Sequence, residues 1–291
     1  MKRIKLLIIL IISILLFSGC NIFKVDNMED IDIITTSYPL EYILDTLYGK
    51  HATINSIYPD GIDTYSYELS EKALKDYSKK DLFVYVSFGR DKDIAVNLLN
   101  RNKSLLIIDG SLGMMPDYID ELWLNPSNLL MVSLNIKNGL LEYIDNNYLK
   151  KEVEENYEEL KLELSMLDAE IKLTAENATS NTILTSNKSL NFLKKYGFNV
   201  ISIDDDNTSL EKTLKEVNEL ISVNKIKYIY SLEYDNENEN AKALLDNNSN
   251  LTEIKLKRLD SIKDAERKNN DISYFSLMKD NIEQLKKETY K

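Results

Sequence analysis

The sequence is poor in the side chains that most often carry catalysis and transition-metal binding. Its 291 residues include one cysteine, Cys20, and one histidine, His51. An intrachain disulfide and a histidine-rich metal site are therefore excluded. The eight glycines form no Gly-x-Ser-x-Gly elbow, no phosphate-binding loop and no glycine-rich dinucleotide turn. We therefore expect a protein that is not an enzyme.

Positive charge is also scarce. The chain holds 36 basic and 48 acidic residues, for a formal net charge of −12. Residues 1–19 contain three basic residues and no acidic ones, so the rest of the chain carries a formal charge of −15. Such a surface repels the phosphates of nucleic acids and anionic lipid headgroups. We expect no nucleic-acid partner and no direct binding to an anionic membrane surface.

The N-terminus has the features of an export signal. Three basic residues lie within the first five positions, and residues 6–17 form an almost unbroken apolar run. A helix needs about 20 apolar residues to cross a membrane, so this run is too short and is typical of a signal peptide. Ser18 and Gly19 then precede Cys20, in a segment that resembles the lipobox of bacterial lipoproteins. We expect cleavage before Cys20 and an extracytoplasmic chain that is lipid-anchored to the cell membrane; an ordinary signal peptide with a chance cysteine is the alternative.

Strand and helix patterns alternate on both sides of a long helical segment. Residues 20–30 form a polar tether, and the alternation in 31–144 predicts an N-terminal lobe of parallel βαβ units. The same order of elements returns in 181–291 and predicts a C-terminal lobe. The sequence therefore predicts an α/β fold with two βα lobes that contain parallel sheets and are joined by one long rigid helix in 145–180.

The linker helix is predicted from its apolar spacing. No glycine or proline interrupts residues 147–180, and charged residues lie between the apolar ones. The pattern fits one amphipathic helix of about 30 residues. Six apolar residues recur at spacings of four and three: Val153, Tyr157, Leu160, Leu164, Leu167 and Ile171.

Five segments in order resemble the zinc- and manganese-binding solute receptors of bacterial ABC importers, many of which are lipoproteins. No single segment is specific for this family, but the order and separations of all five after a lipobox are. The resemblance covers nearly the whole chain after the signal peptide. The segments are Thr35–Leu40, Pro59–Glu68, Glu121–Pro126, Thr185–Asn187 with Phe192–Gly197, and Arg258–Ile262 with Ser273–Asn281.

The resemblance implies a metal in the cleft between the lobes, delivered to an ABC permease and its ATPase. We expect a monomer with these two partners. At the family's four ligand positions this chain has Tyr65, Glu121, Asn187 and Asp260, and only Asp260 keeps the family's residue. The family's histidines are absent from these positions, and His51 lies in a turn outside every motif.

An all-oxygen ligand set changes the expected metal. Zinc favours imidazole and thiolate, whereas phenol, amide and carboxylate oxygens suit Mn²⁺, Mg²⁺ or Ca²⁺ better. Tyr65 would bind strongly only as a phenolate, which requires a metal such as Fe³⁺. We expect a divalent metal, Mn²⁺ or Zn²⁺, with iron as a further option. Glu233 and Asp235 follow a predicted strand over 227–231 and are candidates for supporting the ligands.

Four alternatives to a metal receptor stay open. Hydrogen bonds from Tyr65 to Asp260 and from Asn187 to Glu121 could latch the lobes together without any metal. The cleft could bind another small solute, or it could have lost ligand binding. A surface adhesin or interaction role is the remaining possibility.

Overall fold

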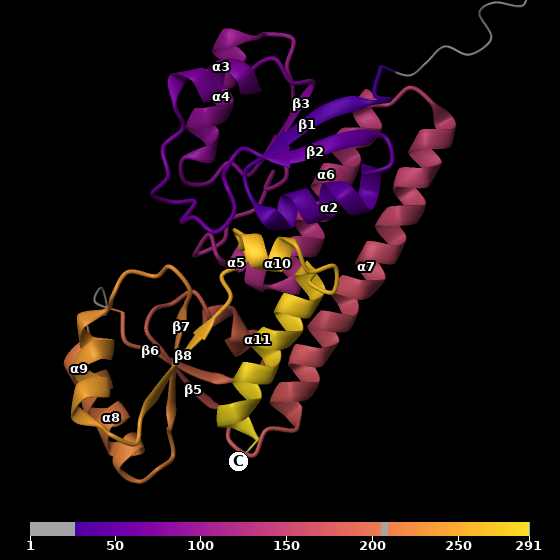
Figure 1. Ribbon diagram of the computed structural model, residues 1–291. Coiled ribbons are helices and arrows are strands. Elements are labelled where there is room, and N and C mark those ends of the chain that lie inside the picture. Colours follow the sequence, from indigo (N-terminus) through magenta and orange to yellow (C-terminus); the bar gives the residue numbers. More distant parts are fainter. Residues whose placement is uncertain (1–26, 205–208, 291) are drawn as a thin grey trace, which may run out of the picture.

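The computed structural model describes residues 27–204 and 209–290. Cys20, the signal peptide and most of the tether lie outside these residues. Figure 1 shows two lobes lying one above the other along a single long helix. None of the helices within the described residues is both long and apolar enough to cross a membrane.

The N-terminal lobe is built on a four-stranded parallel sheet with strand order β2-β1-β3-β4. Its strands are β1 (Ile31–Thr35), β2 (Ala52–Ser56), β3 (Leu82–Tyr85) and β4 (Leu106–Asp109). All four residues of β3 are buried, as expected for a central parallel strand with helices on both faces. The helices of this lobe are α2 (Tyr38–Tyr48), α3 (Glu71–Tyr77), α4 (Asp91–Arg101), α5 (Glu121–Leu124) and α6 (Pro126–Tyr143).

The C-terminal lobe repeats this arrangement with the strand order β6-β5-β7-β8. Its strands are β5 (Thr182–Thr185), β6 (Asn199–Ser202), β7 (Tyr228–Leu232) and β8 (Thr252–Leu256). The helix expected through residues 190–196 is a 3₁₀ helix, η1 (Asn191–Tyr196), which ends at Gly197 with a φ of 106°. The remaining helices are α8 (Leu210–Ser222), α9 (Glu239–Asn247), α10 (Asp264–Arg267) and α11 (Tyr274–Thr289).

The predicted long helix is α7 (Asn147–Glu176), and it is 30 residues long. All six residues of its apolar stripe are buried. The helix packs against α2 and α6 of the N-terminal lobe and against α11, which covers the C-terminal sheet. One helix thus contributes to the cores of both lobes, and the predicted two-lobe α/β fold is confirmed.

Both sheets point the carboxyl ends of their strands toward the space between the lobes (Figure 1). In parallel sheets these ends carry the loops that bind ligands. The loop after β2 and the loop after β8 meet here, because the backbone N–H of Gly61 donates to the carbonyl of Ile262 at 2.8 Å. The fold therefore delivers side chains from both lobes to one place.

Truncating the buried stripe of α7 should destabilise the whole protein. Leu164 is 1% exposed, whereas Leu162 on the same helix is 63% exposed. We expect Leu164→Ala to lower the free energy of unfolding by about 2–4 kcal/mol, because it leaves a cavity in the core. Leu162→Ala is the matched control and should change it by less than about 0.5 kcal/mol. Urea denaturation measures both; equal effects would show that α7 is not held by this stripe.

Candidate functional site

Arg258, just beyond β8, lies at the point where the lobes meet. Its side chain is 3% exposed. Nε donates to Asp260 Oδ1 at 2.9 Å, and Nη2 donates to Asp260 Oδ2 at 3.0 Å and to Asp63 Oδ1 at 2.6 Å. The guanidinium also lies 4.4 Å from the ring centroid of Tyr65 and 5.5 Å from that of Tyr234. The site thus contains a cation supplied by the protein itself.

The neighbouring carboxylates keep this cation charged. Burial alone would lower the pKa of Arg258, but its hydrogen bonds to Asp260 and Asp63 together with the charge of Asp260 outweigh burial and hold the pKa above its ordinary value. Burial alone would raise the pKa of Asp63, but the hydrogen bond and charge of Arg258, together with hydrogen bonds from Ser66 and the backbone of Tyr65, lower it below its ordinary value. Arg258 and Asp63 are therefore ionised at neutral pH and form an ion pair between the lobes.

Tyr65 connects Arg258 to a second carboxylate. Its hydroxyl donates to Asp120 Oδ1 at 2.9 Å, and Ser189 from the C-terminal lobe donates to Asp120 Oδ2 at 3.1 Å. Burial, together with the charges of Asp120 and Asp260, raises the pKa of Tyr65 far above its ordinary value. Burial also raises the pKa of Asp120 to about 6. Tyr65 is therefore a neutral phenol that donates a hydrogen bond to Asp120.

Two of the four family ligand positions come together in this structure. Tyr65 and Asp260 both contact Arg258, and Asp260 also accepts a short hydrogen bond from Thr64. The carboxylate that accepts the hydrogen bond from Tyr65 belongs to Asp120, one residue before Glu121. Glu121 is buried, and burial raises its pKa, with Asp117 adding to the rise.

Asn187 belongs to a turn within the C-terminal lobe. Its amide donates to Asp235 Oδ2 at 2.7 Å, and its oxygen accepts from the backbone N–H of Ser189 at 2.9 Å. Asp235 also accepts from the backbone N–H of Leu232 at 3.0 Å, so it holds Asn187 in place. Glu233, in contrast, lies 3.3 Å from Lys257 and 2.8 Å from Lys263 in ion pairs.

The two latch bonds expected without a metal are replaced by others. Tyr65 bonds to Asp120 and not to Asp260, and Asn187 bonds to Asp235 and not to Glu121. The lobes are instead joined by the pairs Thr64–Asp260, Ser189–Asp120 and Arg258–Asp63. A latch between the lobes therefore exists, but its partners differ because Arg258 takes the carboxylate expected for Tyr65.

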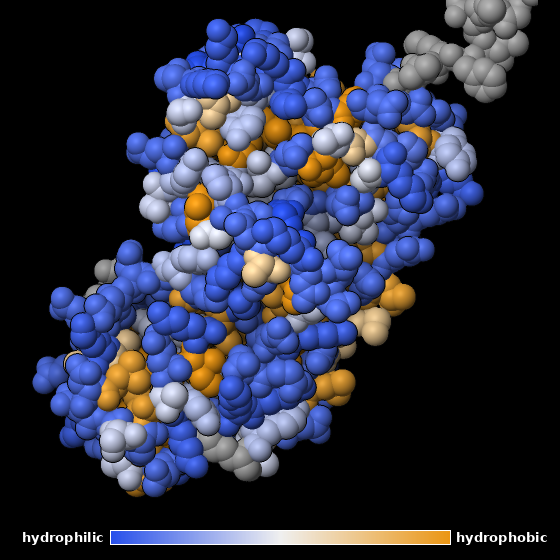
Figure 2. Space-filling view, in the orientation of Figure 1, coloured by the Kyte–Doolittle hydropathy of each residue, from blue (hydrophilic) through white to orange (hydrophobic). Residues whose placement is uncertain are grey.

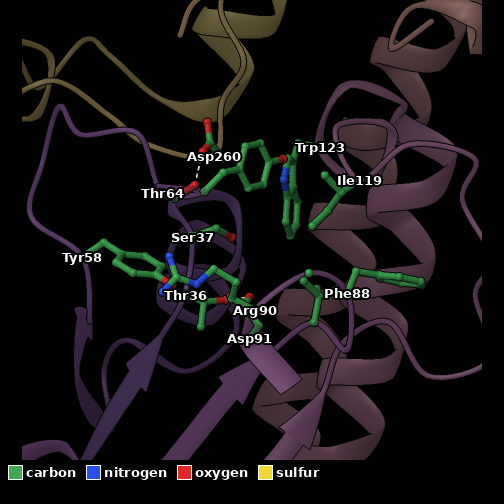
Figure 3. A pocket seen from close by; sticks show the side chains of 13 residues that line it. Thr36, Ser37, Tyr58, Thr64, Phe88, Arg90, Asp91, Ile119, Trp123 and Asp260 are labelled. Atoms are coloured by element: carbon green, nitrogen blue, oxygen red, sulfur yellow. Dashed lines mark hydrogen bonds between the residues drawn. The ribbon is translucent and has the colours of Figure 1, made fainter. Parts of the chain in front are cut away.

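A cavity of about 230 Å³ adjoins this latch (Figure 3). Trp123, Tyr58 and Asp91 are among its lining residues. The hydroxyl of Ser37, at the start of α2, is buried and has no hydrogen-bond partner among the described residues. The space could thus receive a small polar molecule, with Ser37 as an available donor or acceptor.

The donors present do not fit a zinc ion as they are arranged. Zinc sites in proteins are built mainly from imidazole and thiolate. Across residues 27–204 and 209–290, no three His, Cys, Asp or Glu side chains lie close enough together to hold a metal ion. The one histidine, His51, lies 3.0 Å from Glu152 of α7, away from the cleft. Both oxygens of Asp260 are already bonded to Arg258.

Comparison with known proteins identifies the family. Residues 33–288 match the family described as zinc-uptake complex component A, periplasmic. The chain belongs to this family. The zinc-binding lipoprotein AdcA of Streptococcus pneumoniae serotype 4 is 25% identical over a 313-residue alignment, which covers 96% of this chain and 61% of AdcA. The chain therefore spans about three fifths of the length of the curated relatives that it matches.

Solved structures of relatives share the fold. The Zn(II)-bound ZnuA-like domain of S. pneumoniae AdcA gives a TM-score of 0.72 at 24% identity and covers 90% of this chain and 100% of that domain. The lipoprotein YcdH from Bacillus subtilis gives 0.73 at 20% identity, covering 89% and 100%. The laminin-binding protein Lbp of Streptococcus pyogenes gives 0.70 at 20% identity, covering 90% and 99%. The match to the family over residues 33–288 confirms the predicted family, and these structures confirm the predicted fold.

Sequence reasoning missed Arg258, Asp120 and Asp63 as parts of the site. All three lie in or next to the segments that carry the family resemblance. Arg258 offered a signal, because a charged residue beside Leu256 and Leu259 at the end of a predicted buried strand requires a buried partner. Arg258 is not one of the family's four ligand positions.

Asp91, which lines the cavity, should make stability depend on pH. Burial raises its pKa from 3.8 to about 7, although a hydrogen bond from Thr36 opposes the rise. The folded state thus holds this proton more tightly than the unfolded state. The resulting stabilisation is complete below about pH 4 and is lost as the pH rises through 7.

We expect Asp91→Asn to increase the free energy of unfolding by about 1–3 kcal/mol at pH 8 and to have little effect at pH 4. Asp93→Asn, at an exposed position of the same helix, is the control. Denaturant unfolding across this pH range measures the difference. A gain that is the same at both pH values would show that Asp91 does not titrate in this way.

Proposed function

We propose that this chain is the solute-binding lipoprotein of an ABC importer and that its cargo is a divalent metal ion bound between the lobes. Family membership and the two-lobe fold support the role, and AdcA is named a zinc-binding lipoprotein. The proposed partners are an ABC permease and its ATPase, and the proposed working form is a monomer. The role is binding and delivery, without catalysis.

One observation carries the proposal: carboxylates of both lobes converge on one cationic point. Asp63 of the N-terminal lobe and Asp260 of the C-terminal lobe both accept hydrogen bonds from Arg258. Asp120 of the N-terminal lobe accepts a hydrogen bond from the hydroxyl of Tyr65, whose ring lies against the Arg258 guanidinium. With these groups ionised, three negative charges oppose one positive charge and leave a net charge of −2. A divalent cation is the cargo that balances this excess.

The ligand chemistry favours Mn²⁺ over Zn²⁺. The groups at the site offer carboxylate and hydroxyl oxygens, which suit Mn²⁺, and no imidazole or thiolate. Fe³⁺ would have to remove the hydroxyl proton that Tyr65 donates to Asp120. We keep Tyr65, Glu121, Asn187 and Asp260 as the proposed family ligand positions and add Asp120 and Asp63 to them.

Calorimetric titration of the metal-stripped protein with MnCl₂ and ZnCl₂ tests the cargo. We expect saturable Mn²⁺ binding, which Asp260→Ala should weaken by more than about tenfold because it removes the carboxylate that the C-terminal lobe places beside Arg258. Asp264→Ala, at an exposed position four residues away, is the control and should bind like the wild type. Unchanged Mn²⁺ affinity in Asp260→Ala would show that the cargo lies elsewhere.

A small organic solute is the second candidate cargo, because Ser37, whose hydroxyl has no hydrogen-bond partner among the described residues, lines the cavity. Trp123 lines this cavity and is the only tryptophan in the chain. Its fluorescence therefore reports on the cavity directly. A protein that binds neither Mn²⁺ nor Zn²⁺ but shows a saturable fluorescence change with a pool of small amines or amino acids would favour this candidate.

We further propose that Cys20 carries the lipid anchor. The lipobox-like segment and the lipoprotein relative support this proposal. In a bacterial host we expect the wild-type chain to partition into the membrane and into a detergent phase, and Cys20→Ser to remain in the aqueous phase. Equal partitioning of the two chains would contradict lipidation at Cys20.

A further inference from the structure

Arg258 carries a charge of the same sign as the proposed cargo and occupies the place where the carboxylates converge. We propose that its guanidinium is a built-in competitor of the divalent cation, so that Arg258 sets how tightly this protein binds metal. The inference rests on the proposed function, since it concerns the affinity of the same site.

The contacts show that the guanidinium fills the role of a bound cation. Arg258 uses Nε and Nη2 to bond both oxygens of Asp260, and Nη2 also reaches Asp63 in the other lobe. The side chain is 3% exposed and lies over the ring of Tyr65. A surface arginine that pairs transiently with a carboxylate would have neither this burial nor these directed bonds.

In this arrangement hydrogen bonds within the protein already engage both oxygens of Asp260 and both oxygens of Asp120. Both Asp260 oxygens face Arg258, and Oδ2 also accepts from Thr64. The oxygens of Asp120 accept from Tyr65 and Ser189. A divalent ion a few ångströms from a guanidinium would also meet strong repulsion at any effective dielectric constant below that of water.

The latch also means that the lobes can stay together without cargo. In this structure the cation that joins Asp63 of one lobe to Asp260 of the other belongs to the chain itself. Metal therefore has to compete with an intramolecular partner, whose effective concentration is high. We accordingly infer a lower metal affinity than the carboxylates alone would give.

The chain offers a matched control for removing an arginine between the lobes. Arg267 of α10 pairs with Glu41 at 2.7 Å and also with Asp60, but its side chain is 37% exposed and these ion pairs do not involve Asp260. Arg267→Met therefore removes an ion pair between the lobes without removing the cation that is bonded to Asp260 and Asp63. Arg258→Lys is a second control, because it keeps the positive charge and loses the two-pronged geometry.

The decisive experiment compares Mn²⁺ and Zn²⁺ affinity in the detergent-solubilised full chain by calorimetry. We expect Arg258→Met to bind Mn²⁺ more tightly than the wild type by on the order of 100-fold, because the competing charge is gone. Arg267→Met should bind as the wild type does, and Arg258→Lys should stay within about tenfold of it. Thermal unfolding verifies that each variant is folded.

Arg258→Met leaves buried carboxylates unpaired and could therefore fail to fold, so a second variant is needed. Arg258→Met/Asp63→Asn removes one of these charges and retains Asp120 and Asp260, and it should keep the tighter binding. If the wild type binds metal and neither Arg258 variant binds more tightly, the competitor role is overturned while the metal cargo stands. If neither the wild type nor either Arg258 variant binds Mn²⁺ or Zn²⁺, both the competitor role and the metal cargo fail.

Discussion

The buried ion pair between Arg258 and Asp260 is the interaction on which the site depends. Both side chains are 3% exposed, so each charge requires the other. Breaking one partner of such a pair typically costs about 3–5 kcal/mol, because the remaining charge stays buried and uncompensated. The pair also positions the guanidinium over Tyr65 and toward Asp63. It thereby determines which oxygens of the cleft are free and which are occupied.

The fold explains how so many charges reach one place. Two parallel sheets with the same strand order direct their carboxyl ends toward each other, and α7 packs against both lobes. A 30-residue helix shared by two cores favours small lobe movements over a wide hinge. Most of the surrounding surface in Figure 2 is hydrophilic, in keeping with the acidic composition. The packing of α7 against both lobes thus holds the acidic groups of the two lobes close together, although these groups take no part in that packing.

The sequence predicted the fold well because the fold depends on periodic features. The stripe from Val153 to Ile171 and the alternation of strands and helices are regular patterns that burial enforces along the whole chain. The site depends on single contacts across the cleft, which no periodicity encodes. The sequence pointed to Tyr65 and Asp260, but it could not show that Arg258, two residues from Asp260, turns back onto that carboxylate. It likewise could not show that Asp120 faces the cleft beside its neighbour Glu121.

The position of the Arg258 side chain in the metal-free protein tests this account most directly. A crystal structure of the chelator-treated protein would show it without any contribution from cargo. The account predicts a guanidinium over the ring of Tyr65 with both of its hydrogen bonds to Asp260 and the bridge to Asp63. An Arg258 side chain turned into solvent, with Asp120 and Asp260 facing each other across an open cleft, would contradict it.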